Sequence, residues 1–82
     1  MITETITRLE NTVEWIEKEI HETESRIKRL NELLQLESSP FITHILKYEL
    51  GERVWRLTNL RRYKKSYYDI LKIAYDLENN LK

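Results

Sequence analysis

Hydrophobic residues recur along the first 34 positions at alternating intervals of four and three. They are Ile2, Ile6, Leu9, Val13, Ile16, Ile20, Ile27, Leu30 and Leu34, with a single polar member, Thr23. This heptad pattern is typical of an α-helix that packs along one side against another helix. The pattern predicts a helix over about residues 3–37.

The segment Ser38-Ser39-Pro40 separates this helix from a second one. Serine is a common N-cap and proline suits the first helical position, so a new helix is predicted over about residues 40–80. A turn as short as 38–40 makes consecutive helices fold back on each other. The predicted fold is therefore all-α and a single domain, 1–82: an antiparallel, coiled-coil-like hairpin of two long helices.

The hydrophobic pattern of the second helix is broader than that of the first. Its expected core stripe is Ile42, Leu46, Leu50, Val54, Leu57, Leu60, Tyr63, Tyr67, Ile70, Ala74, Leu77 and Leu81. Three more apolar residues lie outside this stripe: Leu71, Ile73 and Tyr75. One neighbouring helix does not cover so wide a face, which favours dimerisation of the hairpin into a four-helix bundle.

Gly51 is the main uncertainty within the second helix. Glycine inside a helix costs about 1 kcal/mol relative to alanine. The sequence therefore leaves open whether the helix is continuous, kinked, or broken into helices 40–50 and 52–80.

Composition narrows the compartment and the class of protein. The 82 residues include 14 Lys and Arg, 14 Asp and Glu, one Gly, one Pro and no Cys, which excludes a disulfide scaffold and argues against a β-rich fold or a multi-domain enzyme. The longest apolar run, Ile73-Ala74-Tyr75, is far short of the roughly 20 residues that span a membrane. We expect a cytoplasmic protein without a membrane segment.

Opposite charges gather in two blocks that the hairpin brings together. Residues 10–24 hold six glutamates against one base, Lys18, whereas residues 53–68 hold no acid. The second block contains six bases: Arg53, Arg56, Arg61, Arg62, Lys64 and Lys65. If facing residue numbers sum to about 77, Glu24 pairs with Arg53 and Glu17 with Arg61, each exposed pair contributing about 0.2–1 kcal/mol.

The same six basic residues are candidates for nucleic-acid contact. Aromatic residues alternate with them, and this combination suits phosphate neutralisation and base stacking. Neutralisation by the glutamates of the first helix favours a structural role instead. A nucleic-acid-binding regulator therefore stays an alternative.

Four residues that lie off the predicted core stripes are the candidates for binding a partner protein. Tyr48, Trp55 and Arg62 lie opposite the core stripe of the second helix, and Trp15 lies off the seam of the first. Trp, Tyr and Arg are the residues that most often carry binding energy at protein interfaces. The predicted function is a non-catalytic interaction module that binds and modulates or bridges a partner protein. The alternatives are a homodimer interface and a structural assembly subunit.

No catalytic, cofactor or metal site is predicted. The chain has no glycine-rich phosphate loop and no nucleophile with an evident base. His21 is placed on a solvent-facing side of the first helix, and His44 is adjacent to the turn. We therefore expect a protein that is not an enzyme.

Overall fold

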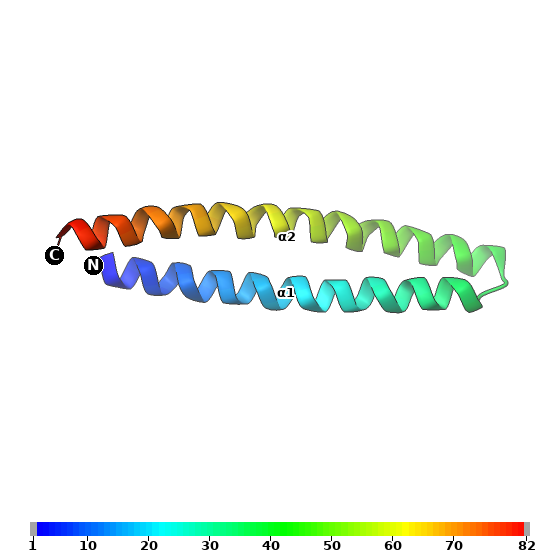
Figure 1. The fold of residues 1–82 in the computed structure, drawn as a ribbon. Coiled ribbons are helices and arrows are strands. Elements are labelled where there is room, and N and C mark those ends of the chain that lie inside the picture. The colour runs from blue at the N-terminus through cyan, green and yellow to red at the C-terminus, as the bar shows by residue number, and fades with distance from the viewer. Residues whose placement is uncertain (1, 82) are drawn as a thin grey trace.

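Two long helices make up most of residues 2–81. The computed structural model describes residues 2–81, with α1 at Ile2–Leu36 and α2 at Pro40–Leu81. The helices lie side by side and antiparallel, with both termini at one end and the turn at the other (Figure 1). The resulting rod is 63 Å long and 15 by 14 Å across. The predicted all-α helical hairpin is confirmed.

The turn is closed by a glutamate that follows α1. Glu37 donates its backbone N–H to the carbonyl of Leu33 at 3.0 Å. Its side-chain Oε1 accepts the backbone N–H groups of Ser38 at 3.1 Å and Ser39 at 2.9 Å. These bonds satisfy backbone donors that the non-helical segment leaves without helical partners.

The start of α2 follows the predicted capping pattern. The Oγ of Ser39 accepts the backbone N–H of Ile42 at 3.4 Å, and its carbonyl accepts that of Thr43 at 2.9 Å. Ser39 is therefore the N-cap, and Pro40 occupies the first helical position, where a missing N–H costs nothing.

Gly51 lies within a continuous helix, so the break that the sequence left open does not occur. Its φ is not positive, and a Cβ added there would meet no atom within 4 Å. The position therefore has room for alanine in the backbone conformation it already adopts.

Replacing Gly51 with Ala should stabilise the protein by about 0.5–1 kcal/mol, because alanine loses less conformational entropy in a helix. Thermal unfolding followed by circular dichroism should show a melting temperature raised by about 2–8 °C. Ser66→Ala, at another exposed position of α2, is the matched control and should give a smaller gain. A lower melting temperature for Gly51→Ala would contradict the open, continuous helix.

The core lies along the contact between the helices. Its buried residues are Ile6, Val13, Ile16 and Thr23 of α1 and Leu57, Leu60, Leu71 and Ala74 of α2. Four of them form one cluster near the termini, with Ile2, Leu9 and Tyr67 packed against it: Ile6, Val13, Leu71 and Ala74. The α1 seam expected from the heptad pattern is the one observed.

The predicted core stripe of α2 is wrong in its C-terminal half. Tyr63, Ile70 and Leu77 are exposed by 57%, 46% and 51%, whereas Leu71, which was placed outside the stripe, is 5% exposed. Two earlier members of the stripe, Ile42 and Val54, are also about half-exposed.

The error came from a choice between two spacings after Leu60. A step of three leads to the apolar Tyr63, but the side that faces α1 continues by four to Lys64 and then reaches Tyr67 and Leu71. Apolar character alone therefore selected the wrong one of two overlapping heptads.

Basic side chains occupy two positions of the α2 seam. Arg53 and Lys64 are only partly exposed, at 30% and 39% of their side chains. Their charged groups reach carboxylates, Arg53 Nε lying 2.9 Å from Glu49 and Lys64 Nζ 3.9 Å from Glu17. The aliphatic stems can then cover the seam while the charges stay near water.

Candidate interaction surfaces

Contacts between the helices define the register of the hairpin. Arg56 Nη2 lies 2.9 Å from Glu19 Oε2, and Arg61 Nη2 lies 3.4 Å from Glu24 Oε2. These residue numbers sum to 75 on one flank and 85 on the other, which centres the register near 80 rather than the expected 77. The two charge blocks do meet.

The individual pairs expected from the sequence are nevertheless wrong. Glu24 pairs with Arg61 rather than Arg53, and Glu17 contacts Lys64 rather than Arg61. The non-helical residues 37–39 carry the chain past the end of α1 before α2 begins, as Figure 1 shows, so α2 is displaced along the axis.

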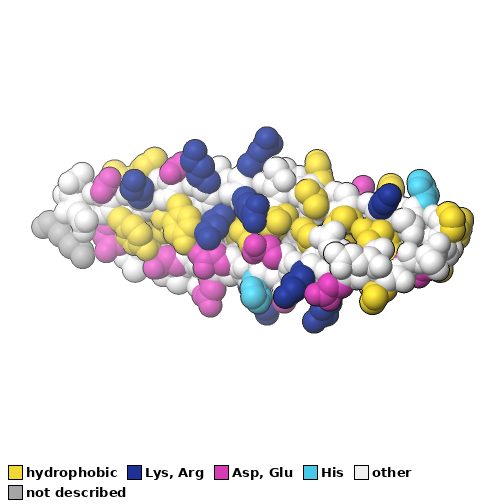
Figure 2. Space-filling view, turned by 45° about the vertical axis from the view of Figure 1, so that its right-hand side comes forward, with side chains coloured by type: hydrophobic (Ala, Val, Ile, Leu, Met, Phe, Trp, Pro, Cys, Tyr) yellow, Lys and Arg dark blue, Asp and Glu magenta, His cyan; other side chains and the backbone are white. Residues whose placement is uncertain are grey.

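One flank carries a series of carboxylates from α1 that contact α2. The hydroxyl of Tyr75 donates to Glu10 at 2.9 Å, and the hydroxyl of Tyr68 donates to Glu17. We call this flank the carboxylate face, defined by Glu10, Glu17, Glu24, Arg61, Tyr68 and Tyr75. In the left half of Figure 2, acidic side chains gather along the lower edge and most basic ones lie above them, whereas further right both kinds lie along the lower edge.

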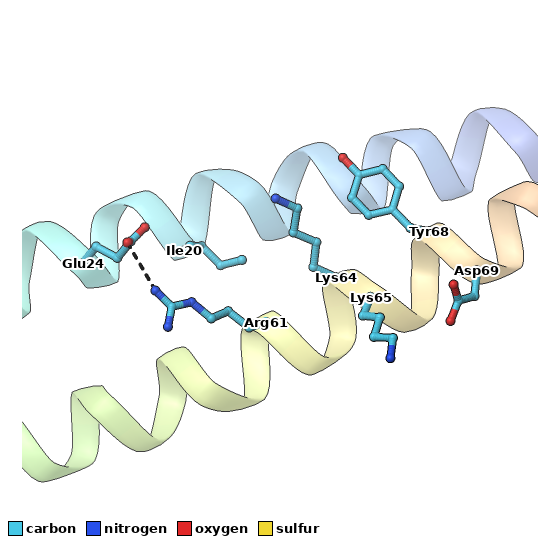
Figure 3. A pocket seen from close by; sticks show the side chains of 7 residues that line it. All are labelled: Ile20, Glu24, Arg61, Lys64, Lys65, Tyr68 and Asp69. Carbon is cyan, nitrogen blue, oxygen red and sulfur yellow. Dashed lines mark hydrogen bonds and ion pairs between the residues drawn. The ribbon is translucent and has the colours of Figure 1, made fainter.

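A surface hollow of about 520 Å³ lies on the carboxylate face. Figure 3 shows its lining: Ile20, Glu24, Arg61, Lys64, Lys65, Tyr68 and Asp69. Lys64 Nζ lies 5.8 Å from the ring centroid of Tyr68, a cation–π contact. Because acids and bases both line the hollow, its surface is not uniformly cationic.

Two tyrosines on this face titrate at higher pH than usual. The hydrogen bond to Glu17, with desolvation and the charge of the carboxylate, raises the pKa of Tyr68 above 10.0. The hydrogen bond to Glu10, again with desolvation and nearby carboxylate charge, raises the pKa of Tyr75. Each phenol stabilises the folded state only while it is protonated.

Replacing both tyrosines with Phe should change how stability depends on alkaline pH. A folded pKa above the unfolded value means that the contribution is fully present below pH 10.0 and is lost as pH rises through the raised pKa. When urea unfolding is compared between neutral pH and a pH above 10.0, the free energy of unfolding should therefore fall less in Tyr68→Phe with Tyr75→Phe than in the wild type. Tyr48→Phe, at an exposed position, is the control and should follow the wild type. Identical curves for all three proteins would contradict these hydrogen bonds.

The basic segment is largely paired with carboxylates. Four of the six residues proposed for nucleic-acid contact form ion pairs: Arg53, Arg56, Arg61 and Lys64. The other two, Arg62 and Lys65, form none within residues 2–81. The unpaired positive charge of the segment is therefore confined to these two residues within the described part of the chain.

Three of the four candidate partner-binding residues share one side of α2. Tyr48 and Trp55 are 68% and 69% exposed, and Arg62 is also exposed; the three follow each other at intervals of seven. Trp15 is 55% exposed but lies on α1. The register puts it level with residue 65, about 15 Å along the axis from Trp55. It does not join the line on α2.

The second flank carries an apolar surface that the sequence did not predict as a separate site. Tyr63, Ile70 and Leu77 of α2 lie exposed on this flank. The ion pair between Glu19 and Arg56 crosses it. We call this flank the apolar face, defined by Glu19, Arg56, Tyr63, Ile70 and Leu77. Near the termini it is hollowed into a groove of about 470 Å³, lined by Ile2, Thr5, Leu9, Ile70, Ile73, Ala74 and Leu77. The signal for this face was the four-three spacing that had been assigned to the hairpin core.

Metal-ligating side chains and long apolar segments are two further features to consider in residues 2–81. Within residues 2–81, no three His, Cys, Asp or Glu side chains come close enough to hold a metal ion. No helix in that range has the length and apolar character needed to cross a membrane. No protein family, curated protein or solved structure matches this chain.

Proposed function

We propose that this protein is a non-catalytic interaction module that binds a partner protein through the outer side of α2 and modulates or bridges that partner. The supporting observation is that Tyr48 and Trp55 each expose about two-thirds of their surface to solvent. They lie on the side of α2 opposite the core residues, so the hairpin does not need them for its own packing. Aromatic residues buried in a partner can each contribute about 2 kcal/mol or more to binding.

The surroundings of Trp55 indicate what the partner must offer. The indole borders a shallow hollow of about 340 Å³, whose other lining residues are Glu49, Glu52, Arg53 and Arg56. About two helical turns beyond Trp55, Arg62 is free of ion pairs within residues 2–81. A complementary surface would hold an apolar pocket for Trp55 and an acidic group for Arg62.

The nucleic-acid alternative is less well supported. Binding to phosphates needs basic residues that are available, and four of the six candidates already contact carboxylates. Retention on DNA or RNA that is steeply salt-dependent would favour that alternative. The proposed location is the cytoplasm, as expected from the sequence.

Affinity capture from host lysate, with and without nuclease, tests the proposed function. The tagged wild type should retain a specific protein after nuclease treatment. The amount of this protein captured by the double variant Tyr48→Ser with Trp55→Ser should be at least tenfold lower, because both aromatic side chains proposed to bind it are removed. Glu14→Ser with Glu22→Ser, at exposed positions of α1, is the control and should capture as the wild type does.

Three results would contradict the proposal. Captured proteins that disappear with nuclease would favour nucleic-acid binding. Recovery of only the chain itself would favour a structural assembly subunit. Undiminished capture by the Tyr48 and Trp55 variant would show that the outer side of α2 is not the binding surface.

A further inference from the structure

We propose that the apolar face is the docking site for a second copy of this chain, forming a four-helix bundle in which both turns lie at the same end. The inference adds a dimer to the interaction role proposed above and uses a different surface of the hairpin. It leaves Tyr48 and Trp55 outside the bundle, where they can bind another protein.

The exposed area of the chain is large for its mass. The accessible surface is 6672 Å² for 10.1 kDa, whereas a typical folded monomer of that mass exposes about 5,300 Å². The excess is about 1,400 Å² per chain. Two copies that cover it would bury roughly 2,800 Å², an area within the range of obligate homodimers.

The apolar face is complementary to itself in composition. Tyr63, Ile70 and Leu77 are spaced by seven along α2, as in the heptad of a helix that packs against another helix. The groove beside them, between Leu9 and Ile73, is apolar along most of its lining. A second copy supplies the same apolar spacing, which suits a two-fold interface in which one patch meets its own equivalent.

Charges on this face select the orientation of the two copies. A two-fold axis along the rod places α1 of one copy beside α2 of the other, again antiparallel. Glu19 then lies beside Arg56 of the second copy, and Arg26 beside Glu49. This repeats between chains the register that joins Glu19 and Arg56 at 2.9 Å within one chain.

The reversed orientation brings together groups that do not match. With the turns at opposite ends, α1 lies beside α1 of the second copy. Glu19 is at the middle of α1 (Ile2–Leu36), so it would meet its own equivalent, a like-charge contact. Glu49, which pairs with Arg53 at 2.9 Å, would lie against Ile70, so a charged group would face the apolar stripe and lose contact with water. The arrangement with both turns together avoids both contacts.

Distance measurement between spin labels tests the proposal on the full chain. The sequence has no cysteine, so Ser38→Cys gives one label per chain, in the exposed turn. The expected distance between the two labels is roughly 10–30 Å, set by helix packing across the bundle. Asn80→Cys at the other end should also give a short distance. A mixture of the two labelled proteins should add a distance near the 63 Å length of the rod.

Two results would overturn the proposal. Ser38 labels separated by about the length of the rod, 63 Å, would show that the turns lie at opposite ends. Absence of dipolar coupling in a monomeric protein would show that no second copy binds, while the capture experiment would still decide the proposed function.

A disruptive variant adds an independent check on the face that is used. Ile70→Lys with Leu77→Lys should convert the dimer into a monomer that keeps its helical circular-dichroism signal, because both residues are half-exposed in the hairpin. Val54→Lys, which is 46% exposed on the other flank, is the matched control and should stay dimeric. A dimer that persists in the double variant would show that the apolar face is not the interface.

Discussion

Replacing Leu71 with Ala should lower the free energy of unfolding by about 2–5 kcal/mol, the usual cost of truncating a buried leucine. Leu71 is 5% exposed and belongs to the buried cluster with Ile6, Val13 and Ala74. Because small domains have total stabilities of only about 5–15 kcal/mol, such a loss is readily measured by urea unfolding.

Val54→Ala is the matched control for this experiment. Val54 was predicted from the sequence to be a core residue, but it is 46% exposed. Its truncation should change stability by no more than about 0.5 kcal/mol. A larger loss for Val54→Ala than for Leu71→Ala would mean that α2 is rotated about its axis relative to the structure described above.

Reversing two charges on α1 should have the second largest effect. Glu17 lies 3.9 Å from Lys64 Nζ, and Glu24 lies 3.4 Å from Arg61 Nη2. Glu17→Lys with Glu24→Lys replaces both attractions with repulsions, and the expected loss of stability at low salt is about 1–2 kcal/mol. The loss should shrink in 1 M salt, where the screening length falls to about 3 Å.

A charge-matched control and a rescue make this test specific. Glu14→Lys with Glu22→Lys changes net charge equally at exposed positions that form no ion pair with α2 within residues 2–81. It should cost clearly less. Adding Arg61→Glu with Lys64→Glu to the first variant should restore stability. If both charge-reversed variants lose the same amount, net charge rather than helix pairing explains the effect.

The sequence predicted α1 and the turn well because each depends on local or strictly periodic signals. The α1 heptad contains one consistent apolar side, so a single register satisfies it. Ser39 and Pro40 act on backbone groups within three or four residues of themselves. Neither feature required knowledge of the other helix.

The α2 seam was harder to predict because α2 carries two overlapping apolar stripes. One runs through Leu71 towards α1, and the other runs through Ile70 and is exposed. The exposed stripe is the more apolar one, because the buried side also contains Arg53 and Lys64. Only the position of the neighbouring helix decides which stripe forms the hairpin core.

The candidate binding residues were predicted from composition and heptad position, and their grouping depended on the register. Heptad position sufficed for Tyr48, Trp55 and Arg62, since all three are on one helix. Placing Trp15 relative to them required the alignment of the two helices. The same alignment decided which carboxylate each basic residue contacts.

Sedimentation equilibrium of the unmodified protein tests most directly whether the apolar face of the hairpin joins two copies of the chain. The expected result is a mass near 20 kDa, twice the 10.1 kDa of one chain, at micromolar concentration. A mass near 10 kDa at every concentration would contradict the claim, because a stable two-helix monomer would then tolerate its exposed apolar face without a second copy.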